Sequence, residues 1–398
     1  MKSIYAVATL SGTIIGAGLF ALPDITMQVG FWVILIYFIV LGALITLIHL
    51  FFGELALKTP DFKRLPGFAR IYLGKRGEMV AYVSTILSLF GAILAYLILG
   101  GEFLSRFFYL LLPEVTSYSE VNTVPYMLLY FFVGAALIFF GIKAIEKVEF
   151  WGLVLFLIFL FIIFFSGIPS ITIKNIENLF VGFGSVSDNK WSGLLPYGII
   201  LFSLWGASLI PEIEEMLGKN KQKLFMIIPV AILIPALIYL FFTFIILGIV
   251  GENVTDNALF GLEAYIGNNM AALALLFGLL TTFTSFITLG LTLKKVFWYD
   301  LKFSKKAAWA ITCFIPLFLY LIGVQNFVLV IFFVGAVMLA IDGILILLMY
   351  RKSLLGSRIA GIAKIKALAV YPLIGLLGGG IVYAVAVYLV PFLKEFLS

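Results

Sequence analysis

This 398-residue chain is poor in the residues from which many active sites and stabilising cross-links are built. It contains one cysteine, Cys313, and one histidine, His49. A single cysteine excludes an internal disulfide and a cysteine-built metal site, and a single histidine leaves no histidine-rich metal cluster and no Ser/His/Asp arrangement in view. No Walker motif is present, which argues against ATP-driven transport. The sequence therefore disfavours an enzyme.

Charged residues are scarce as well. They make up 12% of the chain, whereas hydrophobic residues make up 63%, and an average soluble domain is about 25% charged. This composition indicates a polytopic integral membrane protein in the lipid bilayer. The net charge of +6 comes from Lys and Arg in short loops, where they set topology, so we expect no nucleic-acid binding. More apolar sequence follows the first apolar run directly, so we interpret that run as a span and not as a signal peptide.

The apolar runs predict an all-α protein with eleven transmembrane helices. A helix needs about 20 predominantly apolar residues to cross a bilayer. The candidate spans are residues 4–23, 31–57, 79–101, 124–142, 148–168, 194–211, 224–250, 269–293, 307–322, 327–350 and 368–389.

The distribution of Lys and Arg predicts how these spans are oriented. If the N-terminus is cytoplasmic, 22 of the 26 Lys and Arg residues fall on the inner side, and only Arg106, Lys174, Lys190 and Lys394 fall outside. One missed or invented span would invert every later loop, so the asymmetry supports the helix count. We therefore predict a cytoplasmic N-terminus and an extracellular or periplasmic C-terminus, in the plasma (inner) membrane.

The first span contains residues that interrupt helices. Gly12, Gly16, Gly18 and Pro23 all lie in the motif GTIIGAGLFALP. A helix in hydrocarbon must satisfy its own backbone, so these residues favour a break that something else fills. Freed amides suit an anionic group such as a carboxylate, and freed carbonyls suit a cation. In the alternative, Gly12 and Gly16 form a small-xxx-small packing face and the helix is continuous.

The sixth span repeats this pattern. Its sequence FSLWGASLIPE again places small residues and a proline inside an apolar run. The two spans lie five apart in chain order, so the interrupted helices enter the membrane from opposite sides, as in an inverted-topology repeat. A simple kink at Gly206 and Pro211 is the alternative. The predicted units are a first five-helix repeat at 1–168, an extracellular loop at 169–193, a second five-helix repeat at 194–350, and a cytoplasmic loop with an eleventh helix at 351–398.

These motifs resemble a known group of transporters. GTIIGAGLFALP resembles the first-helix motif of the hydroxy/aromatic amino acid permease and amino acid/auxin permease families, in the amino acid-polyamine-organocation superfamily. SLWGAS followed by PEIEEM is similar to their broken sixth helix, and FFGELA, YLGKRG and TTFTSFITLG fit the same pattern. The resemblance covers nearly the whole chain. It implies the LeuT-type fold, with broken helices one and six, and an amino acid as substrate.

The resemblance also implies where the substrate binds. Amides at the start of the second half-helix would receive the substrate carboxylate, and carbonyls before the break, with the unwound part of span six, would meet its amino group. The residues concerned are Thr13, Ile14, Gly16, Ala17, Gly18, Phe202, Ser203 and Trp205. Trp205 or Phe202 would wall the side-chain pocket, with Tyr96 as a weaker candidate, although aromatic residues are also ordinary core residues in so apolar a chain.

A candidate sodium site involves span eight. Thr281, Thr284 and Ser285 lie on one helical face at i, i+3 and i+4. The resemblance implies that such positions join carbonyls of the first helix, here Gly12 and Ile15, around a sodium ion. Hard oxygen ligands suit a hard cation. In the alternative, these hydroxyl groups only bond back to their own helix. No other cofactor is expected.

Protons are the alternative coupling ion. Ionisable groups inside a membrane are costly and are functional candidates. Asp342 lies near the middle of span ten, and His49 and Glu54 lie in the inner half of span two. His49 is alternatively a neutral packed imidazole bonded to a neighbour. The acidic residues near the inner ends of spans two and six are either members of a cytoplasmic gate or solvated helix ends: Glu54, Glu212, Glu214 and Glu215.

Together these features predict a secondary active transporter that moves an amino acid by alternating access, coupled to a sodium or proton gradient. The glycine-lined first helix would recognise the backbone that all amino acids share. A non-transporting amino acid sensor or a channel on the same scaffold is the alternative, and it would bind a ligand without uptake.

Overall fold

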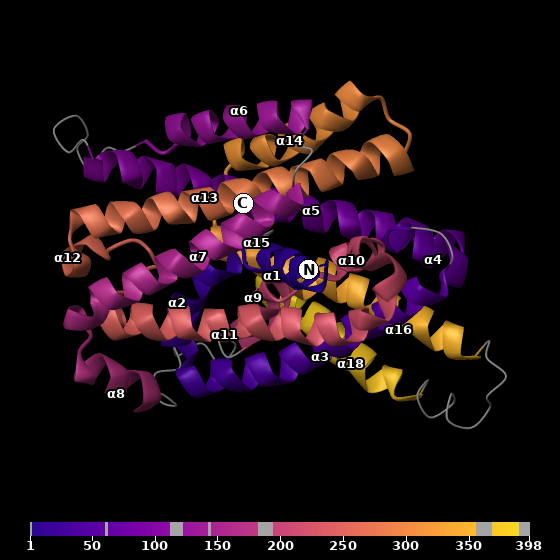
Figure 1. Cartoon of the computed structure of the whole chain (residues 1–398), viewed down its shortest axis with the longest axis horizontal. Coiled ribbons are helices and arrows are strands. Elements are labelled where there is room, and N and C mark those ends of the chain that lie inside the picture. The colour runs from indigo at the N-terminus through magenta and orange to yellow at the C-terminus, as the bar shows by residue number, and fades with distance from the viewer. Residues whose placement is uncertain are drawn as a thin grey trace.

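A computed structural model describes residues 2–59, 63–111, 122–141, 145–181, 194–355 and 368–389 of the chain, and within them every regular element is a helix. The long helices run side by side along one axis (Figure 1). In chain order the helices are α1 (Lys2–Ile14), α2 (Gly18–Val29), α3 (Phe31–Lys58), α4 (Leu65–Leu73), α5 (Lys75–Leu111), α6 (Val124–Phe140), α7 (Ile145–Gly167), α8 (Ile173–Val181), α9 (Leu195–Ser203), α10 (Ile210–Leu217), α11 (Leu224–Val250), α12 (Glu263–Ile266), α13 (Asn268–Lys295), α14 (Lys305–Leu321), α15 (Phe327–Phe333), α16 (Ala340–Leu355) and α18 (Val370–Ala384).

Many of these helices are suited to a bilayer. Among the described residues, six helices are long and apolar enough to cross a membrane, or up to eight if each of two bent helix pairs is one span. One of the six is the run Leu195–Asn253, which contains α9, α10 and α11 in succession. The bent pairs are α1 with α2, at 56°, and Leu157–Ser170 with Ile173–Phe180, at 108°. The chain is thus an all-helical integral membrane protein.

The helix bounds differ from the expected spans mainly at segment ends. A helix or a pair of helices lies on each apolar segment, but α5 extends from Lys75 to Leu111, well beyond the expected 79–101. Apolar composition marks the part of a helix that suits lipid, whereas the helix itself continues for as long as its backbone is hydrogen bonded. Likewise, α2 runs past Pro23 to Val29.

The segment between α3 and α5 contains α4, a helix of the bundle. In α4 the side chains of Leu65, Pro66, Phe68 and Ala69 are buried, and α4 packs against α5 and α16. The segment predicted as an extracellular loop, 169–193, contains the short helix α8, while residues 182–193 lie outside the described part of the chain. In Figure 1, α4 lies at one end of the bundle, which we call the α4 end, and α8 and α12 lie at the other.

The centre of the bundle holds short helices and two backbones in close contact. α1, α9 and α15 lie at the centre of the view, with α6 and α14 on one side and α3 and α18 on the other (Figure 1). A π-helical segment, η8 (Val334–Leu339), joins α15 to α16 and packs on α9. A Cβ atom at Gly335 would lie 1.8 Å from the Gly198 carbonyl oxygen. Only glycine fits there, so the two backbones touch directly.

Candidate functional site

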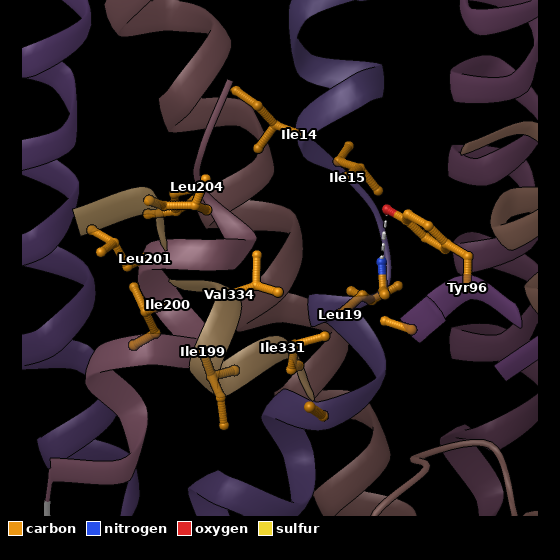
Figure 2. Close-up of a cluster of buried hydrophobic side chains, with 14 of the residues drawn as sticks. Ile14, Ile15, Leu19, Tyr96, Ile199, Ile200, Leu201, Leu204, Ile331 and Val334 are labelled. Atoms are coloured by element: carbon orange, nitrogen blue, oxygen red, sulfur yellow. Dashed lines mark hydrogen bonds between the residues drawn. The ribbon is translucent and has the colours of Figure 1, made fainter. Parts of the chain in front are cut away.

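The first helix is interrupted between Ile14, where α1 ends, and Gly18, where α2 begins. Two tyrosine hydroxyl groups accept hydrogen bonds from backbone amides of this stretch. The Gly16 amide donates to the Tyr239 hydroxyl at 3.4 Å, and the Ala17 amide donates to the Tyr96 hydroxyl at 3.3 Å. Figure 2 shows the Tyr96 hydroxyl pointing at the extended chain between the two half-helices. The alternative of a continuous helix with a small-xxx-small face is therefore wrong.

The break also changes the backbone hydrogen bonding of the first helix. In a continuous helix the amides of Gly16 and Ala17 would bond to the carbonyls four residues earlier, those of Gly12 and Thr13. Both amides bond to tyrosine instead, and the Leu19 amide bonds to the Gly16 carbonyl at 3.1 Å instead of that of Ile15. The break thus replaces regular helical hydrogen bonds with bonds to tyrosine side chains and with a tighter turn.

A second break interrupts the sixth apolar segment. α9 ends at Ser203, a short 3-10 turn (Ala207–Leu209) follows, and α10 begins at Ile210. The Gly206 amide donates to Nε2 of His49 in α3 at 2.9 Å. A histidine ring thus satisfies a backbone amide that the break has freed.

The two breaks lie against each other. The Tyr239 hydroxyl is 2.7 Å from the Ile14 carbonyl oxygen and 3.0 Å from that of Ser203, so one side chain of α11 bridges them. A Cβ atom at Gly18 would lie 1.9 Å from the Ser203 hydroxyl, and one at Gly206 would lie 3.0 Å from the Ile14 side chain. The absence of side chains at both glycines permits this approach.

A cavity opens beside the two breaks and extends toward the α4 end. Its walls carry three charged residues, Arg64, Glu212 and Asp342, and are otherwise uncharged. An apolar cavity with a few polar groups is typical of a small-molecule site. The lining residues are Thr13, Ile14, Gly16, Phe52, Arg64, Leu65, Pro66, Thr85, Ser88, Leu89, Ala92, Tyr96, Phe202, Trp205, Ala207, Ser208, Glu212, Leu289, Thr292, Val296, Val334, Leu339 and Asp342.

Most of the residues predicted to contact substrate line this cavity. Thr13, Ile14, Gly16, Phe202 and Trp205 are on its walls. The three others are buried and are not among its lining residues, and they are Ala17, Gly18 and Ser203.

The amides predicted to receive a carboxylate already have partners in this structure, namely Tyr96 and Tyr239. Sequence reasoning gave Tyr96 a minor role and missed Tyr239. The available signal was a phenol group within the apolar run of α11, since a buried tyrosine hydroxyl usually finds a hydrogen-bond partner.

The hydroxyl groups proposed for sodium lie on α13, in contact with their own helix and with Tyr96. Thr281 donates to the Phe277 carbonyl at 3.1 Å, and Thr284 donates to the Thr281 carbonyl at 3.0 Å. The Ser285 hydroxyl interacts with the Tyr96 hydroxyl, which links α13 to the first break. None of the three lines the cavity. Within the described ranges, no group of three or more His, Cys, Asp or Glu side chains is arranged to hold a metal ion.

The proton-coupling candidates occupy different environments. Asp342 in α16 is buried and is hydrogen bonded to Ser84 in α5. His49 is fully buried, and both of its ring nitrogens are hydrogen bonded. Glu54 instead lies near the end of α3 with 32% of its side chain exposed, 2.7 Å from Lys58 one turn away.

The expected gate of acidic residues is only partly supported by the observed ion pairs. Besides the local Glu54 pair, Glu214 lies 3.4 Å from Lys221, whose side chain is 46% exposed. Exposed local pairs stabilise little. A long-range pair joins Arg64, just before α4, to Asp300, just after α13, at 3.0 Å and partly buried. Sequence reasoning missed this pair because its members lie far apart in the chain.

Comparisons with known proteins agree with this architecture. The chain is 28% identical over 304 residues to a tyrosine-specific transport system 1 of Haemophilus influenzae, a match that covers 73% of this chain and 72% of the relative. It is 25% identical over 255 residues to glutamine transporter 2 of Aliivibrio fischeri, covering 62% of this chain and 60% of that one.

Solved transporter structures share the fold. The closed form of Mhp1, a nucleobase-cation-symport-1 family transporter with bromovinylhydantoin bound, matches with a TM-score of 0.65 at 15% identity and covers 96% of this chain and 89% of its own. MhsT in complex with L-phenylalanine matches with a TM-score of 0.65 at 15% identity, and the match covers 96% of this chain and 98% of the MhsT chain. Both neighbours have the LeuT-type fold.

The strongest evidence of identity is the match to a protein family. The tryptophan/tyrosine permease family matches residues 1–385 of the 398. The relatives are transporters and not enzymes. The chain therefore belongs to the tryptophan/tyrosine permease family.

Proposed function

We propose that the chain is a secondary active transporter that moves an amino acid across the membrane by alternating access, with its substrate site where the two helix breaks meet the cavity. The observation that carries this proposal is the contact between the breaks: donors and acceptors freed from two helices lie together at one end of an otherwise mostly uncharged cavity. The names of the relatives, a tyrosine-specific system and a glutamine transporter, support an amino acid as the substrate class.

In this proposal the substrate carboxylate replaces the tyrosine hydroxyl groups as the acceptor for the amides of Gly16 and Ala17. A carboxylate is the stronger acceptor because a hydrogen bond to an ionised group is shorter and stronger than one to a neutral group. Tyr239 would keep donating its hydrogen to the Ile14 carbonyl, while the Tyr96 hydroxyl would turn its hydrogen toward the carboxylate. The substrate ammonium would bond to backbone carbonyls that precede the break, around Thr13.

The substrate side chain would lie against Phe202 and Trp205, which line the cavity next to the breaks. Two aromatic walls favour a large apolar or aromatic side chain, because flat rings bury a large apolar area and stack with defined geometry. We therefore propose an aromatic amino acid as the preferred substrate.

We also propose the finer architecture that the sequence predicts: eleven membrane spans, an inverted repeat of five helices plus five, and a cytoplasmic N-terminus in the plasma (inner) membrane. The two matched breaks support the repeat. The Lys and Arg residues of the segments between α3 and α5 and between α13 and α14 support placing the α4 end in the cytoplasm.

Coupling to sodium is one proposal for the driving force. The chemistry of the oxygen donors fits sodium: the carbonyls of Gly12 and Ile15 have lost their helical amide partners. Thr281 and Thr284 give their hydrogens to helix carbonyls, so their oxygens keep lone pairs for a cation. With Ser285, these five residues would hold the ion as hard oxygen ligands. A bound sodium would stabilise the broken form of α1 by neutralising the exposed carbonyl dipoles.

Coupling to protons is the second proposal, and Asp342 supports it. The Ser84 hydroxyl has one hydrogen but two acceptors in reach, the Ala81 carbonyl at 3.3 Å and the Asp342 carboxyl. A protonated Asp342 satisfies both bonds, because it donates to Ser84 while Ser84 donates to Ala81. An ionised Asp342 can only accept, so Ser84 donates its hydrogen to Asp342 and no longer to the Ala81 carbonyl. A neutral carboxyl on the cavity wall thus suits a site that loads and releases a proton.

Uptake into proteoliposomes tests the function and separates the two coupling proposals. Labelled tyrosine, tryptophan, phenylalanine and glutamine would be offered under an inward sodium gradient or an inward proton gradient. Sodium-driven uptake that is lost in Thr284→Ala supports the α13 site. Thr46→Ala is the control, because Thr46 lies on α3 and its hydroxyl likewise donates to a carbonyl of its own helix, that of Gly42 at 2.7 Å. Proton-driven uptake that is lost in Asp342→Asn supports proton coupling through the Asp342 carboxyl. Binding without uptake under either gradient would favour the sensor.

A further inference from the structure

His49 is the only histidine of the chain, and it is completely buried in α3. Both of its ring nitrogens have backbone partners. Nδ1 lies 2.8 Å from the Ile45 carbonyl oxygen, one turn earlier in the same helix. Nε2 lies 2.9 Å from the Gly206 amide nitrogen in the second break. The His49 ring therefore links α3 to the second break, between α9 and α10.

These two partners determine the protonation of the ring. An amide nitrogen can only donate, so Nε2 must accept the Gly206 hydrogen and carries none of its own. A carbonyl oxygen can only accept, so Nδ1 must carry the ring hydrogen and donate it to Ile45. The geometry requires the neutral imidazole with its hydrogen on Nδ1. A second proton on Nε2 would oppose the Gly206 hydrogen and break that bond.

The bond to Gly206 matters because of where this amide lies. In a continuous helix it would bond to the Phe202 carbonyl, but that carbonyl accepts the Trp205 amide at 3.4 Å. A buried amide without a partner is strongly unfavourable. The His49 ring also meets the Trp205 ring edge to face, with centroids 5.2 Å apart and planes at 77°. The His49 imidazole thus holds both the amide of Gly206, which directly follows Trp205, and the indole ring of Trp205.

We propose that His49 is a positioning residue for the substrate site: as the neutral Nδ1–H tautomer it holds the second break and Trp205 in the shape that binds substrate, and it does not carry the coupling proton. The proposal rests on the function proposed above, because Trp205 lines the proposed substrate cavity. It replaces the sequence-based candidate role of His49 in proton coupling.

The charged groups around His49 are consistent with a fixed neutral ring. The elements packed against α3 include α10 and α16, which carry Glu212 and Asp342 on the wall of the cavity. On α3 itself, Glu54 is paired with Lys58. Because both ring nitrogens already bond to the backbone, none of these carboxylates provides the ring with the hydrogen-bond partner that would favour a charged imidazole.

Nitrogen NMR of the ring provides a direct test. The protein, labelled with ¹⁵N-histidine, purified without a histidine tag and held in nanodiscs, would give one set of ring signals, because the chain has one histidine. We expect a protonated Nδ1 and an unprotonated Nε2 whose shifts stay constant between about pH 5 and pH 8, the range in which an ordinary histidine titrates. Titration within this range, or the hydrogen on Nε2, would overturn the proposal.

Uptake by two variants tests the positioning role. His49→Gln keeps an oxygen acceptor near the position of Nε2, whereas His49→Leu keeps the bulk and removes the acceptor. We expect His49→Leu to raise KM by about tenfold or more, and His49→Gln by much less, because only the leucine variant leaves the buried Gly206 amide unpaired. Equal KM values for His49→Leu and the wild type would contradict the role.

The two tests can fail independently of the proposed function. If the wild-type protein transports none of the offered amino acids, the proposed function fails, while the NMR signal still decides the state of His49. If His49→Leu does not fold, the comparison of His49→Gln with the wild type and the NMR result remain decisive: a KM for His49→Gln raised as much as tenfold would then count against an acceptor role.

Discussion

The Tyr239 hydroxyl group of α11 donates to the carbonyl oxygen of Ile14, the last residue of α1, across 2.7 Å. The same oxygen accepts the Gly16 amide at 3.4 Å. A single phenol group therefore caps both sides of the helix break, as acceptor for a freed amide and as donor to a freed carbonyl. This arrangement gives the clearest predictions about the site.

Tyr239→Phe removes the hydroxyl and keeps the ring, which is completely buried. We expect a loss of about 1–3 kcal/mol of stability, the cost of unpaired buried polar groups, and substrate uptake reduced by about tenfold. Thermal unfolding in detergent and initial uptake rates measure the two effects. Tyr299→Phe is the control, because Tyr299 is 50% exposed. If Tyr239→Phe and Tyr299→Phe have the same melting temperature and the same uptake rate, the first break does not need the Tyr239 hydroxyl.

Gly18→Ala introduces a Cβ atom that would lie 1.9 Å from the Ser203 hydroxyl oxygen. We expect loss of uptake, because the end of α9 and the start of α2 must separate. Adding Ser203→Gly removes the clashing atoms and should recover part of the activity, since substitutions in contact are not additive. Gly375→Ala, where a Cβ atom meets nothing within 4 Å, is the control. If the effects of Gly18→Ala and Ser203→Gly on uptake simply add in the double variant, this would argue against direct contact between the two breaks.

Gly380→Ala should loosen the last described helix. A Cβ atom at this position would lie 2.2 Å from the Tyr197 ring, through which α18 meets α9, whereas one at Gly379 meets nothing within 4 Å. We therefore expect a lower melting temperature for Gly380→Ala and an unchanged one for Gly379→Ala. Equal melting temperatures would mean that α18 is not docked through Tyr197.

The ion pairs at the α4 end should differ in importance. Arg64 and Asp300 are 20% and 26% exposed and join distant parts of the chain, whereas Lys58 and Glu54 are more exposed and one turn apart. We expect Arg64→Met to lower the melting temperature, and Lys58→Met to change stability by less than about 0.5 kcal/mol. Addition of salt should weaken the effect of Arg64 only slightly, because partly buried pairs are screened less. The opposite ranking of the two variants would contradict this assignment.

The sequence predicted the positions of the breaks but not what fills them. Gly12, Gly16 and Gly18 identify the first break because their spacing is local and a lipid-exposed helix tolerates no unsatisfied backbone. The bonds from Gly16 to Tyr239 and from Gly206 to His49 join residues 223 and 157 positions apart. No local pattern reports which distant side chain reaches a freed amide, because the tertiary packing of the helices decides it.

The candidate ion ligands show the same limit. The helical spacing of Thr281 and Thr284 predicts a shared face, yet it does not distinguish hydroxyl groups bonded to their own helix, as both are here, from hydroxyl groups that bind a ligand. Glu54 and Asp342 are both carboxylates within apolar sequence, but one lies near a helix end beside a lysine and the other is buried. Depth within the bundle depends on how the helices are stacked.

The contact between Gly198 and Gly335 has a mechanical consequence. With no side chain between them, the backbones of α9 and η8 are in direct contact. η8 continues into α16, where Asp342 lies. We therefore expect a tilt of α9 to move η8 and the start of α16 with it, so that a movement at the second break reaches the buried acid.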